Sequence, residues 1–270
     1  MLDCPMPSLS LSESRELRQM VIGCPRWGKA VQFVLKNLEN LKDQTILDLG
    51  CGTGVVGVFL ALHGANIIGL DLDPKALKMA QDLAANFGQQ DACSFLVGSG
   101  EAMAVGTETV DIVFSRSTLQ YMDRSRAMSE CLRVLKPGGI MILLQNLPSN
   151  PFLKIFRLIR RWRSRDDDAR AYVESIKGYV TLPELHSLES AFSGFEWEFY
   201  HLLDVPTVEL RRHFKKSRLL LGIEEILDRI DTLAFNRIPF LRKLAWFVAV
   251  VYKGKKGDIH QAGDRNAPAL

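Results

Sequence analysis

The sequence lacks a hydrophobic run long enough to cross a bilayer, and it also lacks paired cysteines. Its longest unbroken apolar run is the nine residues Leu244 to Tyr252, whereas a spanning helix needs about 20. The first ten residues show no basic stretch followed by an apolar one, so we expect no secretory signal. The five cysteines form no C-x-x-C pair, so we expect neither a disulfide framework nor a metal site. These absences favour a globular protein of the reducing cytoplasm.

Little net charge is present, but its distribution is uneven. The formal net charge of the 270 residues is +3. Residues 1–150 carry −2, residues 151–256 carry +6 and residues 257–270 carry −1. A surplus of this size is far below that of a dedicated nucleic-acid binder, so we expect no nucleic-acid partner. The basic second half instead favours an anionic partner.

Short apolar runs alternate with helical stretches through the first 147 residues. The runs that we interpret as buried strands are Thr45–Leu49, Asn66–Leu72, Ser94–Val97, Val110–Ser115 and Ile140–Leu144. A helix over 124–135 is expected to stop sharply at Lys136-Pro137-Gly138-Gly139. Asp73 and Pro74 are typical of the N-cap and first residue of a helix. This alternation predicts an α/β fold with a parallel, doubly wound sheet that is covered on both faces.

The second half divides into further parts. We expect an N-terminal helical cap over 1–44, a cofactor-binding core over 45–147 and a helical substrate lid over 148–194. Residues 195–256 should supply two last strands, Phe195–Leu203 and Trp246–Tyr252, with helices between them. Residues 257–270 resemble a disordered tail in composition.

The segment Ile46–Gly54 (ILDLGCGTG) joins the first strand to the first helix of the core. Glycines allow a tight turn and a close backbone approach to a ligand, and the helix N-terminus offers free N–H groups. Gly52-x-Gly54-x-x-Gly57 also satisfies the dinucleotide pattern, and Asp71 follows Gly52 by 19 residues, near the spacing of a ribose-binding acid. A dinucleotide oxidoreductase is therefore one interpretation.

Asp48 favours a different adenosine cofactor. Its carboxylate stands just before the first glycine, where it would repel a pyrophosphate but attract a cationic amine. S-adenosylmethionine carries such an amine on its methionine tail. We therefore prefer this cofactor to a dinucleotide.

Five motifs resemble, in order and spacing, those of the class I S-adenosylmethionine-dependent methyltransferases, in particular the type 11 methyltransferase domain. They are LDLGCGTG (Leu47–Gly54), GLDLDP (Gly69–Pro74), VGSGEAMAV (Val97–Val105), VDIVFSRSTLQYMD (Val110–Asp123) and RVLKPGGIMIL (Arg133–Leu143). The resemblance implies a Rossmann-like, seven-stranded, mostly parallel sheet with one of its last two strands antiparallel. It also implies a helical lid inserted after the fifth strand.

The resemblance assigns binding roles residue by residue. The residues implied to line the methionine end are Asp48, Gly50, Cys51, Gly52 and Gly54, with the backbone of Ser115 facing the same moiety. Asp71 is implied to accept hydrogen bonds from the ribose diol and Leu72 to pack on adenine. Gly100, Glu101 and Ala102 are implied to lie near the adenine amine. Ser99 departs from the family, which usually has an acid there, so either its hydroxyl, Glu101 or a water substitutes, or the affinity for the cofactor is reduced.

No catalytic residue transfers from the family, because the sulfonium is already an activated methyl donor. An oxygen acceptor still needs a base. The candidates are Tyr121, His186 and His201, although packing or surface roles compete for each. We expect methyl transfer to a small-molecule or lipid-like acceptor, more often at oxygen than elsewhere. A non-catalytic binding protein on the same fold is the further alternative.

Residues 152–163 have the pattern of an amphipathic basic helix. Phe152, Ile155, Phe156, Ile159 and Trp162 recur at steps of three and four, with basic residues opposite. One interpretation is a lid helix with its apolar face on the core. A second is a surface helix that contacts anionic lipid or a lipid-linked substrate, which would make the protein peripheral to the membrane.

Overall fold

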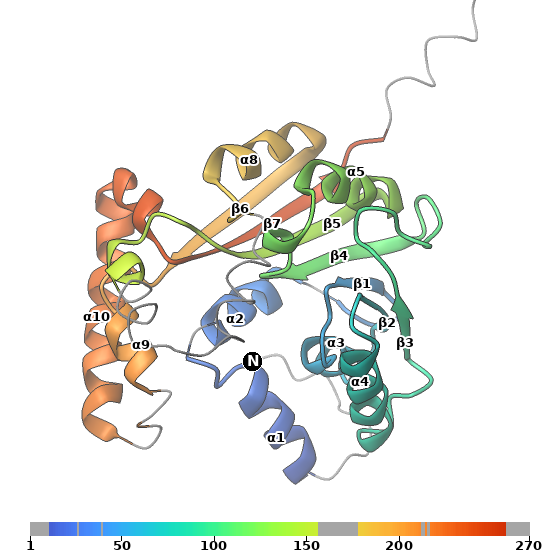
Figure 1. The fold of residues 1–270 in the computed structure, drawn as a ribbon, viewed down its shortest axis with the longest axis horizontal. Helices are drawn as coiled ribbons and strands as arrows, with labels where there is room; N and C mark the ends of the chain where they lie inside the picture. The colour runs from blue at the N-terminus through green and yellow to red at the C-terminus, as the bar shows by residue number, and fades with distance from the viewer. Residues whose placement is uncertain are drawn as a thin grey trace, which may run out of the picture.

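The computed structural model describes residues 11–257 apart from 26, 39, 156–177, 212–213 and 215–216. Its seven strands form one sheet in the order β3-β2-β1-β4-β5-β7-β6 (Figure 1). The strands are β1 Thr45–Leu49, β2 Asn66–Asp71, β3 Cys93–Val97, β4 Val110–Arg116, β5 Leu135–Asn146, β6 Phe192–Tyr200 and β7 Phe247–Lys255. Strand β7 runs antiparallel to both of its neighbours, and β1 to β5 are parallel. The predicted fold class and the single antiparallel strand are confirmed.

Helices cover both faces of the sheet, as parallel strands require. They are α1 Leu11–Val21, α2 Gly28–Asn37, α3 Val55–Ala61, α4 Pro74–Asn86, α5 Arg124–Val134, α8 Leu182–Ser187, α9 Val205–Arg211 and α10 Arg218–Arg237. Short 3-10 turns are η1 Leu119–Tyr121, η2 Leu188–Ala191 and η3 Pro239–Leu244. Asp73 caps α4 as predicted, because its side chain accepts a hydrogen bond of 2.8 Å from the N–H of Lys75. Figure 1 shows α5 and α8 on one side of the sheet and α1 to α3 on the other.

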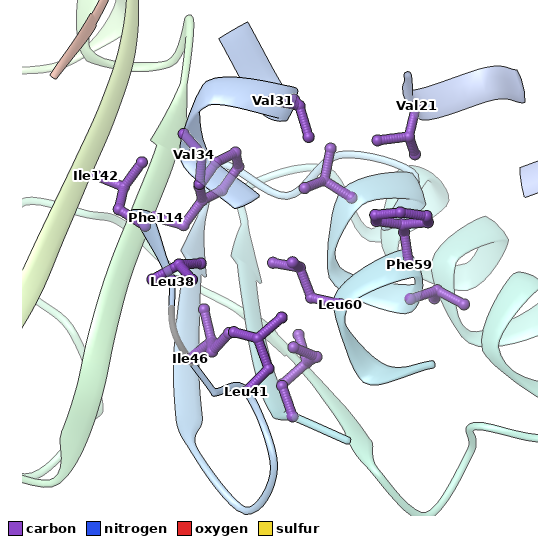
Figure 2. Close-up of a cluster of buried hydrophobic side chains, with 14 of the residues drawn as sticks. Val21, Val31, Val34, Leu38, Leu41, Ile46, Phe59, Leu60, Phe114 and Ile142 are labelled. Carbon is purple, nitrogen blue, oxygen red and sulfur yellow. The ribbon is translucent and has the colours of Figure 1, made fainter. Parts of the chain in front are cut away.

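The N-terminal helices share a core with the sheet. Val21 of α1, Val31 and Val34 of α2, Phe59 of α3 and Phe114 of β4 belong to one buried cluster, in which Phe114 lies beside Val34 (Figure 2). All five side chains are buried. Burial of this apolar area holds α1 and α2 against the sheet.

Three of the expected strands differ from the observed ones by more than one residue, among them Trp246–Tyr252, which is observed as β7 Phe247–Lys255. The fifth strand begins at Leu135, and residues 136–139, expected as a sharp stop, form an irregular part of β5 opposite Val110 and Ile112. The ammonium of Lys136 holds this stretch to Asp111 of β4 at 2.7 Å. The sixth strand runs Phe192–Tyr200 rather than Phe195–Leu203, since residues 201–203 turn away towards α9.

The inward apolar face that the lid interpretation gives to the basic helix is wrong in the part that the structure describes. Residues 151–155 are helical, but Leu153 is the side chain that packs inward, against Val205 and Val208 of α9. Phe152 and Ile155, expected on the core, are exposed. The remainder of the predicted helix, residues 156–177 of the expected lid and residues 258–270 of the expected tail lie outside the described residues.

The carboxyl ends of the parallel strands meet at one edge of the sheet. Because β6 and β5 are both antiparallel to β7, β6 also ends at this edge and β7 begins there. The segments that gather at this edge are therefore 50–54, 72–73, 98–102, 117–121, 147–150 and 201–204. Open α/β sheets bind their ligands at such an edge. Among the described residues, no helix is long and apolar enough to cross a membrane.

Candidate functional site

The turn between β1 and α3 adopts a backbone conformation that favours glycine. Gly50, Gly52 and Gly54 have φ values of 69°, 54° and 70°, which L side chains rarely adopt. The carbonyl of Leu70 at the end of β2 accepts hydrogen bonds from the N–H groups of Gly50 at 2.7 Å and Cys51 at 3.2 Å. The main chain of β2 therefore holds this turn in place.

At Gly50 and Gly54 neighbouring side chains also leave no room for a Cβ atom. A Cβ on Gly50 would collide with the side chain of Thr118, and one on Gly54 would lie 2.7 Å from the Cβ of Ala80. A Cβ on Gly52 would meet nothing within 4 Å. The turn is thus packed against protein at its two ends and faces open space at its centre, as a cradle for a ligand requires.

Asp71 at the end of β2 joins the turn to α4. Its Oδ2 accepts a hydrogen bond of 2.8 Å from the N–H of Gly52, and its Oδ1 accepts one of 3.0 Å from the N–H of Asp73. The side chain is half-buried. A carboxylate has about four lone-pair positions, so Asp71 retains acceptor capacity for the hydroxyls of a ribose.

Asp48 is a buried carboxyl group behind the turn. Only 3% of the residue is exposed, and burial raises its pKa to about 7, while the guanidinium of Arg116 and the N–H of Gly57 oppose that rise. At neutral pH this group therefore lies near its midpoint of ionisation. A cationic amine placed beside it would hold it ionised.

Arg116 connects the site to the N-terminal helices. Its guanidinium carbon lies 4.2 Å from the centre of the Trp27 ring, a cation–π geometry. Trp27 immediately precedes α2. The helices of the expected N-terminal cap thus reach the carboxyl end of β4.

The loop after β3 is fixed by the two residues whose roles the sequence left open. The hydroxyl oxygen of Ser99 accepts a hydrogen bond of 3.1 Å from the N–H of Glu101. The Oε1 of Glu101 accepts one of 2.7 Å from the N–H of Asp123. Gly100 is buried, and a Cβ there would lie 2.7 Å from Leu49. Ser99 and Glu101 therefore shape the loop that the resemblance implies to lie beside adenine.

Two exposed apolar side chains flank Asp71. Leu72, which follows it, is 69% exposed, and Val97, its partner in the β2–β3 register, is 64% exposed. Exposed aliphatic groups at this edge suit the face of an aromatic base. Val97 is a residue that our sequence analysis did not single out as a binding residue, although its motif was recognised.

Thr118, two residues after β4, has a structural role that the sequence did not reveal. The hydroxyl of Thr118 donates to the carbonyls of Arg116 at 3.1 Å and Gly50 at 3.4 Å, which ties β4 to the turn. The carbonyl of Ser115 accepts from the Gln145 side chain at 3.2 Å. The role of Ser115 towards the methionine moiety stays a prediction.

The three candidate bases lie in separate surroundings. Tyr121 ends η1 at the carboxyl edge. His186 of α8 is exposed, bonds Glu189 at 2.8 Å and stacks on Trp197 of β6. His201 is buried at the same edge as the turn, with its Nδ1 2.8 Å from the carboxylate of Asp204. These contacts favour packing roles for both histidines.

The surroundings of Cys51 do not favour a reactive thiol. Cys51 is buried, and burial raises the pKa of its thiol, which disfavours a nucleophilic thiolate. The residues that the structure describes contain no group of three or more His, Cys, Asp or Glu side chains placed to hold a metal ion.

Comparison with protein families matches residues 47–143 to the methyltransferase domain family. A sterol 4-C-methyltransferase from Caenorhabditis elegans is 30% identical over 122 residues, which are 45% of this chain and 36% of that protein. A ubiquinone/menaquinone biosynthesis C-methyltransferase from Geobacter sulfurreducens is 24% identical over 253 residues, 92% of this chain and 81% of that protein. The chain thus spans only about a third of the length of the sterol enzyme.

The fold matches solved methyltransferase structures. The geranyl diphosphate C-methyltransferase of Streptomyces coelicolor, crystallised with S-adenosyl-L-homocysteine, superposes with a TM-score of 0.55 at 17% identity, covering 85% of this chain and 75% of that one. The family match spans β1 to β5 and contains all five sequence motifs. These matches support a class I S-adenosylmethionine-dependent methyltransferase domain over residues 47–143 of the chain.

Proposed function

We propose that this protein transfers a methyl group from S-adenosylmethionine to a lipid-like small molecule. The observation that carries the proposal is the turn of residues 50–54, which is held by Asp71 on one side and backed by buried Asp48 on the other. An adenosine with a cationic amino-acid tail matches both carboxyl groups. A diphosphate would meet the charge of Asp48 instead.

The residues of the site fit this cofactor from end to end. Asp48 and the main chain of residues 50–54 take the methionine end, and Asp71 takes the ribose diol. Leu72 and Val97 would pack against adenine, and the loop 99–102 would lie near its amine. When bound, the cofactor supplies a methyl group already activated by the sulfonium.

The chain's own task is then to place an acceptor in line with that methyl group and to exclude water. Segments 117–121 and 147–150 lie at the same edge and are positioned to shape the acceptor side. Relatives are named as acting on a sterol and in ubiquinone or menaquinone biosynthesis, which supports a hydrophobic acceptor. Both C- and O-methyltransferases occur among the relatives. Within the enzyme class we propose oxygen as the acceptor atom.

Calorimetric titration with S-adenosylmethionine and S-adenosylhomocysteine tests the cofactor, and titration with NADH tests the dinucleotide alternative. We expect binding of the first two and none of the third. A second assay follows transfer of labelled methyl from the cofactor to a panel of demethylated quinones, sterols and prenyl phosphates. Release of S-adenosylhomocysteine with a methylated product supports the enzyme, and product analysis identifies the acceptor atom. Cofactor binding without turnover across the panel would favour a non-catalytic protein.

A further inference from the structure

Helix α10 is partly inverted relative to an ordinary surface helix, because acidic residues lie on its buried side together with Phe235. It buries the acids Glu224 and Asp231 and exposes large aliphatic side chains: Leu219 is 74% exposed, Ile226 60% and Leu233 57%. Surface helices normally bury the apolar stripe and expose the charges. This inversion places on the surface apolar area that would otherwise be removed from water.

The buried acids hold α10 in this orientation. The carboxylate of Asp231 accepts hydrogen bonds from the N–H of Leu202 at 2.7 Å and the N–H of Leu203 at 3.0 Å, in the segment that follows β6. Phe235, also buried, lies against Phe199 of β6 with ring centres 6.0 Å apart. These contacts fix the rotation of α10 about its axis, and so they determine which side of the helix is exposed.

The exposed side chains form one continuous stripe, which we call the apolar seam: Leu219, Ile223, Ile226, Ile230 and Leu233. The steps of four and three residues put all five on one side of the helix. At 1.5 Å per residue the seam is about 21 Å long. Phe214 before α10 and Phe240 after it are also exposed, so apolar side chains extend past both ends of the helix.

The seam lies in the part of the chain that connects β6 to β7 at the carboxyl edge of the sheet. Helices α9 and α10 are inserted between β6, which ends at that edge, and β7, which begins there. The helical segment 151–155, which packs on α9, exposes Ile155 as well. Figure 1 shows α10 at the outer margin of the molecule, beside α9 and far from β3.

Charge around the seam is basic. The described residues 218–244 contain five Lys and Arg (Arg218, Arg229, Arg237, Arg242 and Lys243) and four Asp and Glu. Two of those acids are the buried pair, Asp228 is bonded to Lys29 at 2.6 Å, and Glu225 to Arg229 at 3.0 Å. An apolar stripe with surrounding cations is complementary to anionic headgroups over an acyl layer.

We propose that the apolar seam docks this protein on an anionic lipid bilayer, from which the acceptor reaches the site. The inference rests on the proposed function for the lipid-like acceptor, but the docking itself does not need turnover. A second copy of the chain suits the charge less well, because pairing two seams would bring two such basic surfaces together. Docking by α10 also explains the inverted helix, since the exposed aliphatic groups leave water when they enter the interface.

Flotation of the full chain with vesicles tests the proposal. The probe is phosphatidylcholine vesicles with about one third phosphatidylserine, compared with phosphatidylcholine alone. We expect binding to the first, weaker binding to the second, and loss of binding as salt rises. The double variant Ile226→Gln/Leu233→Gln should lower partitioning at least about tenfold. The matched control Met20→Gln/Met79→Gln replaces side chains that are 47% and 59% exposed on α1 and α4, and should bind as the unmodified chain does.

Titration with S-adenosylhomocysteine on the same samples separates the two claims. Equal affinity in all three proteins shows that the site is intact, so a loss of flotation belongs to the seam. Cofactor binding with no flotation of the unmodified chain would overturn the docking proposal and leave the proposed function standing. Vesicle binding without cofactor binding would do the reverse. Sedimentation velocity showing a dimer that the seam variant dissociates would identify a second copy as the occupant and also overturn it.

Discussion

The Oδ2 of Asp71 lies 2.8 Å from the backbone nitrogen of Gly52, so one carboxylate at the end of β2 holds the turn that follows β1. The same side chain is the proposed acceptor for the ribose hydroxyls. Asp71 can both hold the turn and face the ribose, because the carboxyl ends of the neighbouring parallel strands β1 and β2 lie side by side. Substitution of Asp71 therefore affects both the shape of the cradle and the contacts of the ligand.

Replacing Asp71 with Ala should raise the Kd for S-adenosylhomocysteine at least about tenfold, because a charge-assisted hydrogen bond to a ligand contributes about 1.5–3 kcal/mol. Asp71→Asn keeps one acceptor oxygen and should show a smaller loss. Asp73→Asn is the matched control, since it removes a charge two residues away and preserves an oxygen for the N–H of Lys75. Calorimetry measures all three. An unchanged affinity in Asp71→Ala would remove the ribose role.

Binding of the cofactor should depend on pH through Asp48. Its pKa is raised to about 7, chiefly by burial, and the amine of the ligand requires the ionised form. Lowering the pH from 7.5 to 6.0 should therefore raise the Kd about five- to tenfold and increase proton release on binding. Asp48→Asn should bind weakly at both pH values without this dependence. The control Asp82→Asn, a substitution on the surface of α4, should show the same pH dependence as the unmodified protein. If the Kd of the unmodified protein did not change between these pH values, the proposed role of Asp48 would be contradicted.

The same carboxyl group should lower the stability of the fold as pH rises. The folded pKa of Asp48 lies above its ordinary value of 3.8, so the neutral form is favoured by folding and the cost of ionisation appears between about pH 4 and pH 7. Asp48→Asn, which is isosteric and uncharged, should be more stable than the unmodified chain at pH 8 by on the order of 4 kcal/mol. The two should be equally stable at pH 4. Urea unfolding at both pH values measures the difference, and an equal gain at both would contradict it.

Local patterns in the sequence predicted the central strands and the cofactor turn. The runs Thr45–Leu49 and Val110–Ser115 match β1 and β4 within one residue, since buried parallel strands read as continuous apolar runs. The expected strand Asn66–Leu72 ends one residue after the observed β2, whose last residue is Asp71. These features depend on residues close together in the chain, which is why their spacing was informative.

Features that depend on distant residues could not be predicted in this way. The inward side of helix 151–155 is decided by Leu153 meeting Val205 and Val208, more than 50 residues away. Thr118 reaches the turn across 68 residues. The inversion of α10 likewise needs the N–H groups after β6, which Asp231 satisfies. A periodicity identifies a helix and its stripe, but the partner decides which side is buried.

Asn150 illustrates a long-range role that also permits a sharp test. Its Nδ2 lies 3.0 Å from the carbonyl oxygen of His201, 3.2 Å from that of Leu202 and 2.9 Å from that of Leu244, while its Oδ1 accepts from the N–H of Leu153 at 3.0 Å. One buried amide thereby joins the segments that follow β5 and β6 to the one before β7. Removing it takes the amide partner from the carbonyls of Leu202 and Leu244 and from the N–H of Leu153, while the carbonyl of His201 still accepts from the N–H of Trp246 at 2.9 Å. A buried main-chain group that loses its partner costs about 1–3 kcal/mol.

Asn150→Ala should therefore lower the free energy of unfolding by roughly 3 kcal/mol, measured by urea at pH 7. Asn150→Asp is nearly isosteric and keeps the oxygen that accepts from Leu153, yet it should be worse than Ala, because it places a carboxylate against three carbonyl oxygens. Its deficit should shrink at pH 4, where a protonated carboxyl can donate to one of them. The exposed Asn236 of α10 provides the control, since Asn236→Asp should change stability by less than about 0.5 kcal/mol. Equal stability of the Asp and Asn forms at position 150 would show that the amide donor does not hold these segments together.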